Sequence, residues 1–391
     1  MIEIFNLLKS YLNKYYESFL KEKKPVAYLS AMSPHELFRA FGYNIFLPEN
    51  HSAFLGSRRM AQPYIKRAIQ EGFSPEICSY LLSDIGSHLE KKCAFENYRL
   101  KEFPKPEIIC YSTNQCNEIG EWFKFLGKLY KVPVLSIPAV KNFNNEKMFL
   151  DFYENSIISV IKNIENIRGE KLNEAKLVEN LKYTRMASKN WESFLNLNLN
   201  SNYKFSFLDH LFLMAPMVLG RGRFDTYKFY EKLYKFGLKT KNKEYKYRIW
   251  WEGMPVWSKL KYFKEKFEEL EIALVGSTYA SSWVFTFKGK KPIENLSKIY
   301  YKDLFITWAE EKKREWLKEK IKKFNLDGFI FMEAKTCRAN TNTHFGMPSK
   351  IYNETGVPSL ILYGDMVDLS LFSETETNLK LEAFLETIKK E

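Results

Sequence analysis

The stretch Ile108-Ile-Cys-Tyr-Ser112, taken with Val132-Pro-Val-Leu-Ser-Ile-Pro138, decides the fold of this chain. Both are short apolar runs of the kind that form buried strands. Between them, residues Glu118–Tyr130 have the length and apolar content of a helix. A strand, a helix and a second strand in this order predict a parallel sheet covered by helices.

The same alternation extends toward the N-terminus. Four elements are expected there: a helix over residues 4–20, strands over 26–30 and 43–48, and a helix over 57–71. Ser33 is followed by Pro34 and the acidic Glu36, an arrangement that predicts a helix with Ser33 as its N-terminal cap.

A second set of strands and helices occupies the C-terminal part of the chain, and residues 148–240 before it have mainly helical patterns. We expect strands at 248–251, 272–275, 327–332 and 359–363, and helices at 259–270, 307–324 and 374–389. The predicted fold class is therefore α/β, with two Rossmann- or flavodoxin-like parallel-sheet domains. The expected boundaries are 1–25 for an N-terminal helix, 26–147 for the first α/β domain, 148–243 for a helical connecting segment and 244–391 for the second α/β domain.

Composition narrows the class of partner. The chain has 391 residues, 45% of them hydrophobic, which is enough for two or three cores and argues against disorder. Its formal net charge of +13 has three interpretations: a Lys-rich surface, a phosphate-bearing ligand such as a coenzyme A thioester, or nucleic acid. Basic and acidic residues are mixed along residues 312–320, which is typical of a solvated helix face and disfavours nucleic acid.

The cysteine count and the N-terminus indicate a reducing, cytoplasmic setting. Five cysteines is an odd number, and the first residues lack the basic and apolar regions of a signal peptide. No run of 18 apolar residues occurs, so no membrane partner is expected. In such a setting cysteines serve more often as metal ligands or core residues than as disulfides.

Three cysteines, Cys78, Cys116 and Cys337, lie where a strand or turn gives way to a helix. Thiolates are the usual ligands of iron–sulfur clusters, and three of them leave one iron of a four-iron cluster open for substrate or water. Ligands of open parallel sheets bind beyond the carboxyl ends of the strands, so two facing α/β units could hold one cluster between them. The alternative is that all three are buried structural thiols, because their spacing matches no compact ferredoxin motif. Cys110 lies inside an apolar strand and Cys93 on an expected helix, so both are assigned to packing.

Further polar candidates follow the first strands. Glu49 and His51 come directly after residues 43–48, where a carboxylate and an imidazole could exchange protons, or could be polar loop residues. The basic segment 220–223 could reach a phosphate. No P-loop and no paired-histidine motif occurs, which argues against ATP hydrolysis by this chain and against a zinc site.

Together these segments resemble the 2-hydroxyacyl-CoA dehydratase family, which also contains the B- and C-type subunits of ATP-dependent benzoyl-CoA reductase. The resemblance covers roughly residues 25–388, and its strength lies in the order of the matching segments. These segments are Ser33–Gly42, Pro48–His51, Gly72–Tyr80, Thr113–Cys116, Arg248–Trp257, Asp327–Cys337 and Gly356–Asp365.

The resemblance implies one [4Fe-4S] cluster, held by Cys78, Cys116 and Cys337. It further implies a second related subunit in a heterodimer or homodimer, an ATP-dependent cluster-containing activator that delivers a low-potential electron, and an acyl- or aroyl-CoA substrate for radical chemistry. Glu49, His51 and Ser33 would then lie near the substrate. Dehydration and ring reduction remain open, as does the choice between the substrate-binding subunit and its partner. A second hypothesis is an electron-transfer or double-cubane-type reductase protein of the same fold, without an acyl-CoA substrate.

Overall fold

The computed structural model describes the chain except for residues 141–145, 288–290, 303–307, 342–345 and 389–391. Its strands are β1 Val26–Leu29, β2 Asn44–Phe46, β3 Ile108–Ser112, β4 Val134–Ile137, β5 Tyr247–Gly253, β6 Ile272–Ser277, β7 Gly328–Ala334 and β8 Ser359–Gly364. Its helices are α1 Ile2–Lys21, α2 His35–Ala40, α3 Pro48–Ser57, α4 Ala61–Gln70, α5 Ser79–Leu89, α6 Glu118–Tyr130, α7 Glu146–Arg168, α8 Glu174–Leu195, α9 Phe207–Leu213, α10 Ala215–Gly220, α11 Phe224–Lys239, α12 Leu260–Glu269, α13 Thr278–Ser281, α14 Pro292–Ser297, α15 Glu310–Phe324, α16 Met347–Thr355 and α17 Glu374–Thr387.

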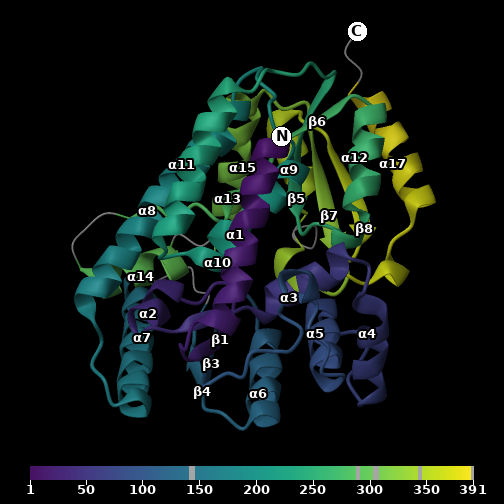
Figure 1. Cartoon of the computed structure of the whole chain (residues 1–391). Coiled ribbons are helices and arrows are strands. Elements are labelled where there is room, and N and C mark those ends of the chain that lie inside the picture. Colours follow the sequence, from purple (N-terminus) through teal and green to yellow (C-terminus); the bar gives the residue numbers. More distant parts are fainter. Residues whose placement is uncertain (141–145, 288–290, 303–307, 342–345, 389–391) are drawn as a thin grey trace.

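Two four-stranded sheets, both parallel throughout, form the two halves of the molecule (Figure 1). The strand orders are β2-β1-β3-β4 and β6-β5-β7-β8. In each half the second strand therefore lies on one side of the first strand, and the third and fourth strands lie on its other side. Ala27 pairs with Ile108 in the first sheet, and Ile249 pairs with Gly328 in the second. The predicted fold class, α/β with two parallel-sheet units, is confirmed.

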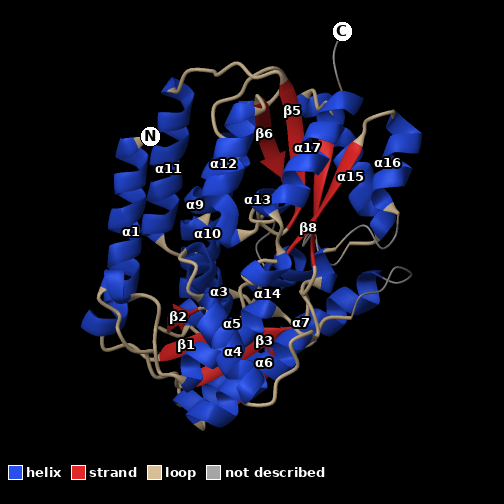
Figure 2. Cartoon of the chain, turned by 90° about the vertical axis from the view of Figure 1, so that its right-hand side faces the viewer, coloured by secondary structure: helices blue, strands red, loops and turns tan. Residues whose placement is uncertain are grey.

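Helices cover the sheets as their apolar faces dictate. In β5, Trp251 packs with Phe263 and Phe267 of α12, while Trp250 points to the opposite face and packs with Trp316 and Phe324. Successive strand residues point to opposite faces, so a sheet buried on both sides needs an apolar run of this kind. Figure 2 shows both sheets enclosed by helices in the view turned by 90°.

The segment between the two sheets is helical, as its sequence predicts. It contains α7 to α11, and α11 packs against α8 and α1. No helix in the part of the chain that the structure describes has the length and apolarity to cross a lipid bilayer. The expected start of α15 and end of α17 reach into residues outside the described ranges; within them, α15 begins at Glu310 and α17 ends at Thr387.

Three local predictions are wrong. The expected helix over 57–71 is shorter and corresponds to α4, which begins at Ala61; residue 57 ends the preceding helix α3, and Arg59 lies between the two at a positive φ of 58°. Ser33 does not cap α2, because that helix begins at His35 and the Ser33 hydroxyl is hydrogen-bonded to the Ser30 hydroxyl over 2.7 Å. Cys93 does not lie on a helix, since α5 ends four residues earlier, but it is buried.

Candidate functional site

The strand orders locate the site. In each sheet the chain reverses its direction of winding between two neighbouring strands, β1 and β3 in the first and β5 and β7 in the second. Ligands of open α/β sheets bind beyond the carboxyl ends of the strands at such a reversal. A cavity of about 140 Å³ lies there, lined from the first sheet by Met32 and Cys116 and from the second by Met254 and Cys337.

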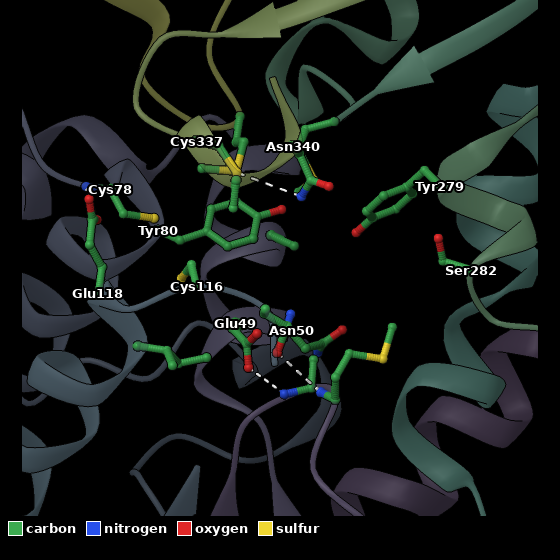
Figure 3. A pocket seen from close by; sticks show the side chains of 18 of the residues that line it. Glu49, Asn50, Cys78, Tyr80, Cys116, Glu118, Tyr279, Ser282, Cys337 and Asn340 are labelled. Atoms are coloured by element: carbon green, nitrogen blue, oxygen red, sulfur yellow. Dashed lines mark hydrogen bonds between the residues drawn. The ribbon is translucent and has the colours of Figure 1, made fainter. Parts of the chain in front are cut away.

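The three cysteines singled out by their positions all line this cavity. Cys78 directly precedes α5, Cys116 lies two residues before α6, and Cys337 directly follows the turn after β7. Figure 3 shows their sulfur atoms directed into the same space. Cys110, by contrast, is fully buried inside β3, and its sequence neighbours in the strand are buried as well.

The thiols influence one another electrostatically. Burial raises the pKa of Cys116 to about 11 and that of Cys337 to about 12, and the charge of Cys116 contributes to the second shift. Burial raises the pKa of Cys78 well above its ordinary value, and the proximity of Cys337 raises it further. All three are therefore neutral thiols near pH 7, and binding a metal would release their protons.

The donor set at the cavity consists of three thiols. Within the described ranges, no three His, Cys, Asp or Glu side chains are close enough to hold one metal ion. A single ion needs every sulfur at about 2.3 Å from one centre, whereas a cluster takes one thiolate per iron and so spreads its ligands. The three thiols around this cavity are of the ligand type that iron–sulfur clusters take.

Polar contacts fix the cysteine-bearing turns. The backbone N–H of Cys78 donates to Glu118 Oε2 over 2.8 Å, which joins the start of α5 to the start of α6. The Asn340 amide donates to Cys337 Sγ over 3.7 Å. These contacts are independent of any bound group, so the turns that carry the thiols are held by the protein itself.

Asp365, at the carboxyl end of β8, connects the two halves of the site. Its carboxylate accepts hydrogen bonds from the Ser79 hydroxyl and from both the backbone N–H and the hydroxyl of Thr336, the last two over 3.0 and 2.6 Å. The side chain is 1% exposed. Ser79 adjoins Cys78 and Thr336 adjoins Cys337, so one buried carboxylate holds two cysteine turns from different sheets.

Glu49 lies in the first turn of α3 and lines the cavity. Its carboxylate accepts a hydrogen bond from the backbone N–H of Ala31, in the turn after β1 (Figure 3). Burial raises the pKa of Glu49 to about 7, although the Ala31 hydrogen bond opposes the shift. A carboxyl with this pKa can both release and accept a proton near neutral pH.

His51 lies behind the cavity wall. Its Nε2 accepts from the Ala94 backbone N–H over 3.1 Å, so Nδ1 carries the proton and donates to Asp84 over 2.7 Å. The second oxygen of Asp84 accepts from the Trp122 indole over 2.9 Å, and Trp122 lines the cavity. His51 is therefore connected to the cavity by its hydrogen bond to Asp84 and by the hydrogen bond between Asp84 and Trp122.

Ser33 also lies behind the wall, and it is fully buried. Its backbone carbonyl accepts a hydrogen bond from Arg221, which also donates to the carbonyl of Ala31. Arg221 belongs to the basic segment 220–223, which the sequence suggests for phosphate binding. The structure instead buries this guanidinium completely, and its role is to hold the turn after β1.

A second cavity, of about 450 Å³, adjoins the first. The two share the lining residues Asn50, Ala53, Val218 and Tyr279. The second cavity is also lined by three exposed cationic residues, Arg58, Arg59 and Lys261. The site thus consists of an inner cavity at the thiols and an outer cavity with three exposed cationic residues in its lining.

Comparison with known proteins gives a consistent result. The family model described as 2-hydroxyglutaryl-CoA dehydratase, D-component, matches residues 30–388. The (R)-2-hydroxyisocaproyl-CoA dehydratase alpha subunit of Clostridioides difficile is 22% identical, over 94% of this chain and 91% of its own. The (R)-phenyllactyl-CoA dehydratase alpha subunit of Clostridium sporogenes is 25% identical, over 93% and 89%, and a benzoyl-CoA reductase subunit of Thauera aromatica is 24% identical, over 90% and 86%.

Proposed function

The chain belongs to the 2-hydroxyglutaryl-CoA dehydratase D-component family, and from that premise we propose that it is the iron–sulfur subunit of an acyl-CoA-processing radical enzyme. As its relatives indicate, it is a subunit of the 2-hydroxyacyl-CoA dehydratase or benzoyl-CoA-reductase-like kind. A second related subunit would complete the enzyme. An ATP-dependent activator with its own cluster would supply the electron, since this sequence has no P-loop of its own.

One observation carries the proposal: three thiols from two separate sheets line a single cavity at the carboxyl ends of the central strands. Cys78, Cys116 and Cys337 would hold a [4Fe-4S] cluster there. When bound, such a cluster supplies one-electron transfer and an open iron position. The chain itself contributes preformed turns, walls that exclude water, and Glu49.

The outer cavity supports a coenzyme A thioester as substrate. Guanidinium and ammonium groups bind phosphate oxygens, and Arg58, Arg59 and Lys261 present three of them beside the outer cavity. A thioester whose phosphates rest at these residues would direct its acyl end past Asn50 and Val218, toward the thiols. Electron delivery without a thioester, in a protein of the same fold, would leave these three cationic side chains without a role.

The proposed roles of the polar residues follow from their positions. Glu49 faces the cavity and would move a proton at its carboxylate, close to the acyl group. His51 and Ser33 would act as positioning residues, His51 through Asp84 on Trp122 and Ser33 through the turn that carries Ala31. Each of these assignments is separable, because only Glu49 contacts the cavity directly.

Iron and sulfide analysis tests the proposal. We expect about four irons per chain after anaerobic reconstitution, and a loss of most of that iron in Cys78→Ala, Cys116→Ala and Cys337→Ala. The matched controls Cys93→Ala and Cys110→Ala remove thiols that lie outside the cavity, and they should keep the wild-type iron content. An iron-free wild type would overturn the proposal. About eight irons per chain would favour the double-cubane alternative instead.

A further inference from the structure

We propose that the inner cavity selects an acyl group that is uncharged and largely apolar, and that it rejects an acyl group ending in a second carboxylate. This inference rests on the proposed acyl-CoA function and specifies its substrate class. It concerns only the acyl group of the thioester, because the coenzyme A part is the same in all such substrates.

The charges around the cavity carry the argument. Among the described residues that line it there is no Lys, Arg or His, and the only charged side chains are Glu49 and Glu118. The walls are mainly apolar: Met32, Ile119, Trp122, Val218, Met254 and Trp283. An anionic acyl group would find no cation to pair with and would face two carboxylates.

The Arg221 cation lies behind this wall, and its N–H groups are already occupied. The Arg221 guanidinium lies 5.3 Å from the ring centre of Trp283. Its five N–H groups have five partners: the Tyr300 hydroxyl and the carbonyls of Ala31, Ser33, Met217 and Val218.

The charge of Arg221 is balanced as well. Tyr300, which accepts from Arg221, donates to the buried Glu36 over 2.7 Å. With no free N–H and a counter-charge within the same hydrogen-bonded chain, Arg221 has nothing left to offer a substrate carboxylate. Recruiting it would require breaking contacts that hold the turn after β1.

The energetic consequence differs sharply between the two substrate classes. A carboxylate that enters the cavity loses its hydration and finds no cation among the described lining residues, only neutral donors such as Asn50, Gln115 and Ser282, and burial of a charge without a counter-charge is unfavourable. A branched alkyl or aromatic group loses only its contact with water and gains contact with methionine and tryptophan side chains. The cavity therefore discriminates by charge, even between groups of the same size.

The acyl group inferred for this chain differs from the one that the description of the matching family contains. That description contains 2-hydroxyglutaryl, which is a dicarboxylic acyl group. Two of the relatives have hydroxyisocaproyl and phenyllactyl in their names, both of which are uncharged apolar acyl groups. The lining of the cavity favours the second class for this chain.

Equilibrium binding of two thioesters of the same shape tests the inference. We would titrate the full chain, purified anaerobically, with 2-hydroxy-5-methylhexanoyl-CoA and with 2-hydroxyglutaryl-CoA. The two acyl groups have the same number of heavy atoms and differ in an isopropyl end against a carboxylate. We expect the neutral thioester to bind at least ~100-fold more tightly.

A charge-restoring variant and free coenzyme A complete the test. Met254→Lys adds a cation to the wall and should reduce the ratio of the two affinities by about tenfold, whereas Met254→Leu should preserve it. Equal binding of both thioesters to the wild type would overturn the inference and leave the proposed function intact. Failure of both thioesters and of free coenzyme A to bind would overturn the proposed function together with the inference.

Discussion

The backbone N–H of Ser79 donates a 3.0 Å hydrogen bond to the side-chain oxygen of Thr336. These residues are 257 positions apart in the sequence, yet they directly adjoin Cys78 and Cys337. Asp365 accepts from both of them and so closes a buried three-residue network between the two sheets. The relative position of two cysteine turns is therefore determined by the fold itself.

Asp365→Asn should weaken this network while preserving its shape. Each carboxylate oxygen of Asp365 accepts from at least one backbone N–H, Thr336 on one side and Val367 on the other. An amide NH2 placed on either side would meet a donor, at a cost of about 1–3 kcal/mol. We expect a clear loss of iron per chain after anaerobic reconstitution, measured together with the thermal unfolding midpoint of the iron-free protein.

Asp368→Asn is the matched control for that experiment. Asp368 lies three residues away and accepts hydrogen bonds from Gln62 and Ser370, away from the cysteine turns. It should lose no more than a few tenths of a kcal/mol and keep its iron. A wild-type iron content in Asp365→Asn would show that the network is not needed to position the thiols.

Glu49→Gln should change how stability depends on pH. Burial raises the pKa of Glu49 from 4.5 to about 7, so the folded protein favours the protonated carboxyl more than the unfolded chain does. The stability contributed by this group is fully present below about pH 4.5 and is lost as the pH rises through 7. Because one pKa unit corresponds to about 1.4 kcal/mol, and because the side chain is only partly buried, the loss should be on the order of 2 kcal/mol.

Denaturant unfolding at about pH 5 and about pH 8 measures that difference. Other titrating groups contribute equally to both proteins, so the comparison isolates residue 49. Glu49→Gln should lose less stability than the wild type over this interval. Parallel curves for the two proteins would contradict the raised pKa of the carboxyl.

The strands were predictable because their signal is local. Residues 108–112 and 118–130 are β3 and α6 with the bounds that the apolar pattern predicts. The helix at Pro48–Ser57 was not predicted, because its buried residues include Pro48, His51, Ser52 and Gly56 and give almost no apolar stripe. Its first turn also follows a strand directly, which made it resemble a loop.

The site was predictable only in part, for a related reason. The three cysteines could be proposed because each follows a strand or turn, and that position is visible in the sequence. Arg221 and Asp365 could not, because their partners are remote: Arg221 reaches Ala31 across 190 positions, and Asp365 reaches Ser79 across 286. A single sequence contains no signal for such contacts, and a buried arginine in a Gly-Arg-Gly-Arg segment resembles a phosphate-binding one.

Gly86→Ala should loosen the helix that begins after Cys78. A methyl group at Gly86 would lie 1.9 Å from the Tyr64 carbonyl oxygen of α4, and a backbone atom cannot move aside without separating the two helices. We expect a loss of at least ~2 kcal/mol in the free energy of unfolding, as is usual for overpacking. Gly120→Ala is the control, because its nearest neighbour would be a Tyr111 ring atom at 3.4 Å; it should be neutral or slightly stabilising. Equal effects of the two substitutions would contradict this account of α4–α5 packing.

His51→Ala tests whether the hydrogen bond between His51 and Asp84 stabilises the fold, as opposed to the burial of an imidazole ring alone. His51 and Asp84 are both completely buried, and the histidine donates to the carboxylate over 2.7 Å. Removing His51 leaves one oxygen of the buried Asp84 without its imidazole donor, while Trp122 still donates to the other oxygen, so we expect a loss of about 1–3 kcal/mol in chemical unfolding. His210→Leu is the matched control, since His210 is equally buried but its ring has no hydrogen-bond partner within the described ranges. Burial lowers the pKa of His210 to about 3, so it is already neutral, and an apolar residue of similar volume should be tolerated. If His210→Leu lost as much stability as His51→Ala, removal of a buried imidazole would be costly even without a hydrogen-bond partner, and the Asp84 contact would not be the cause of the loss.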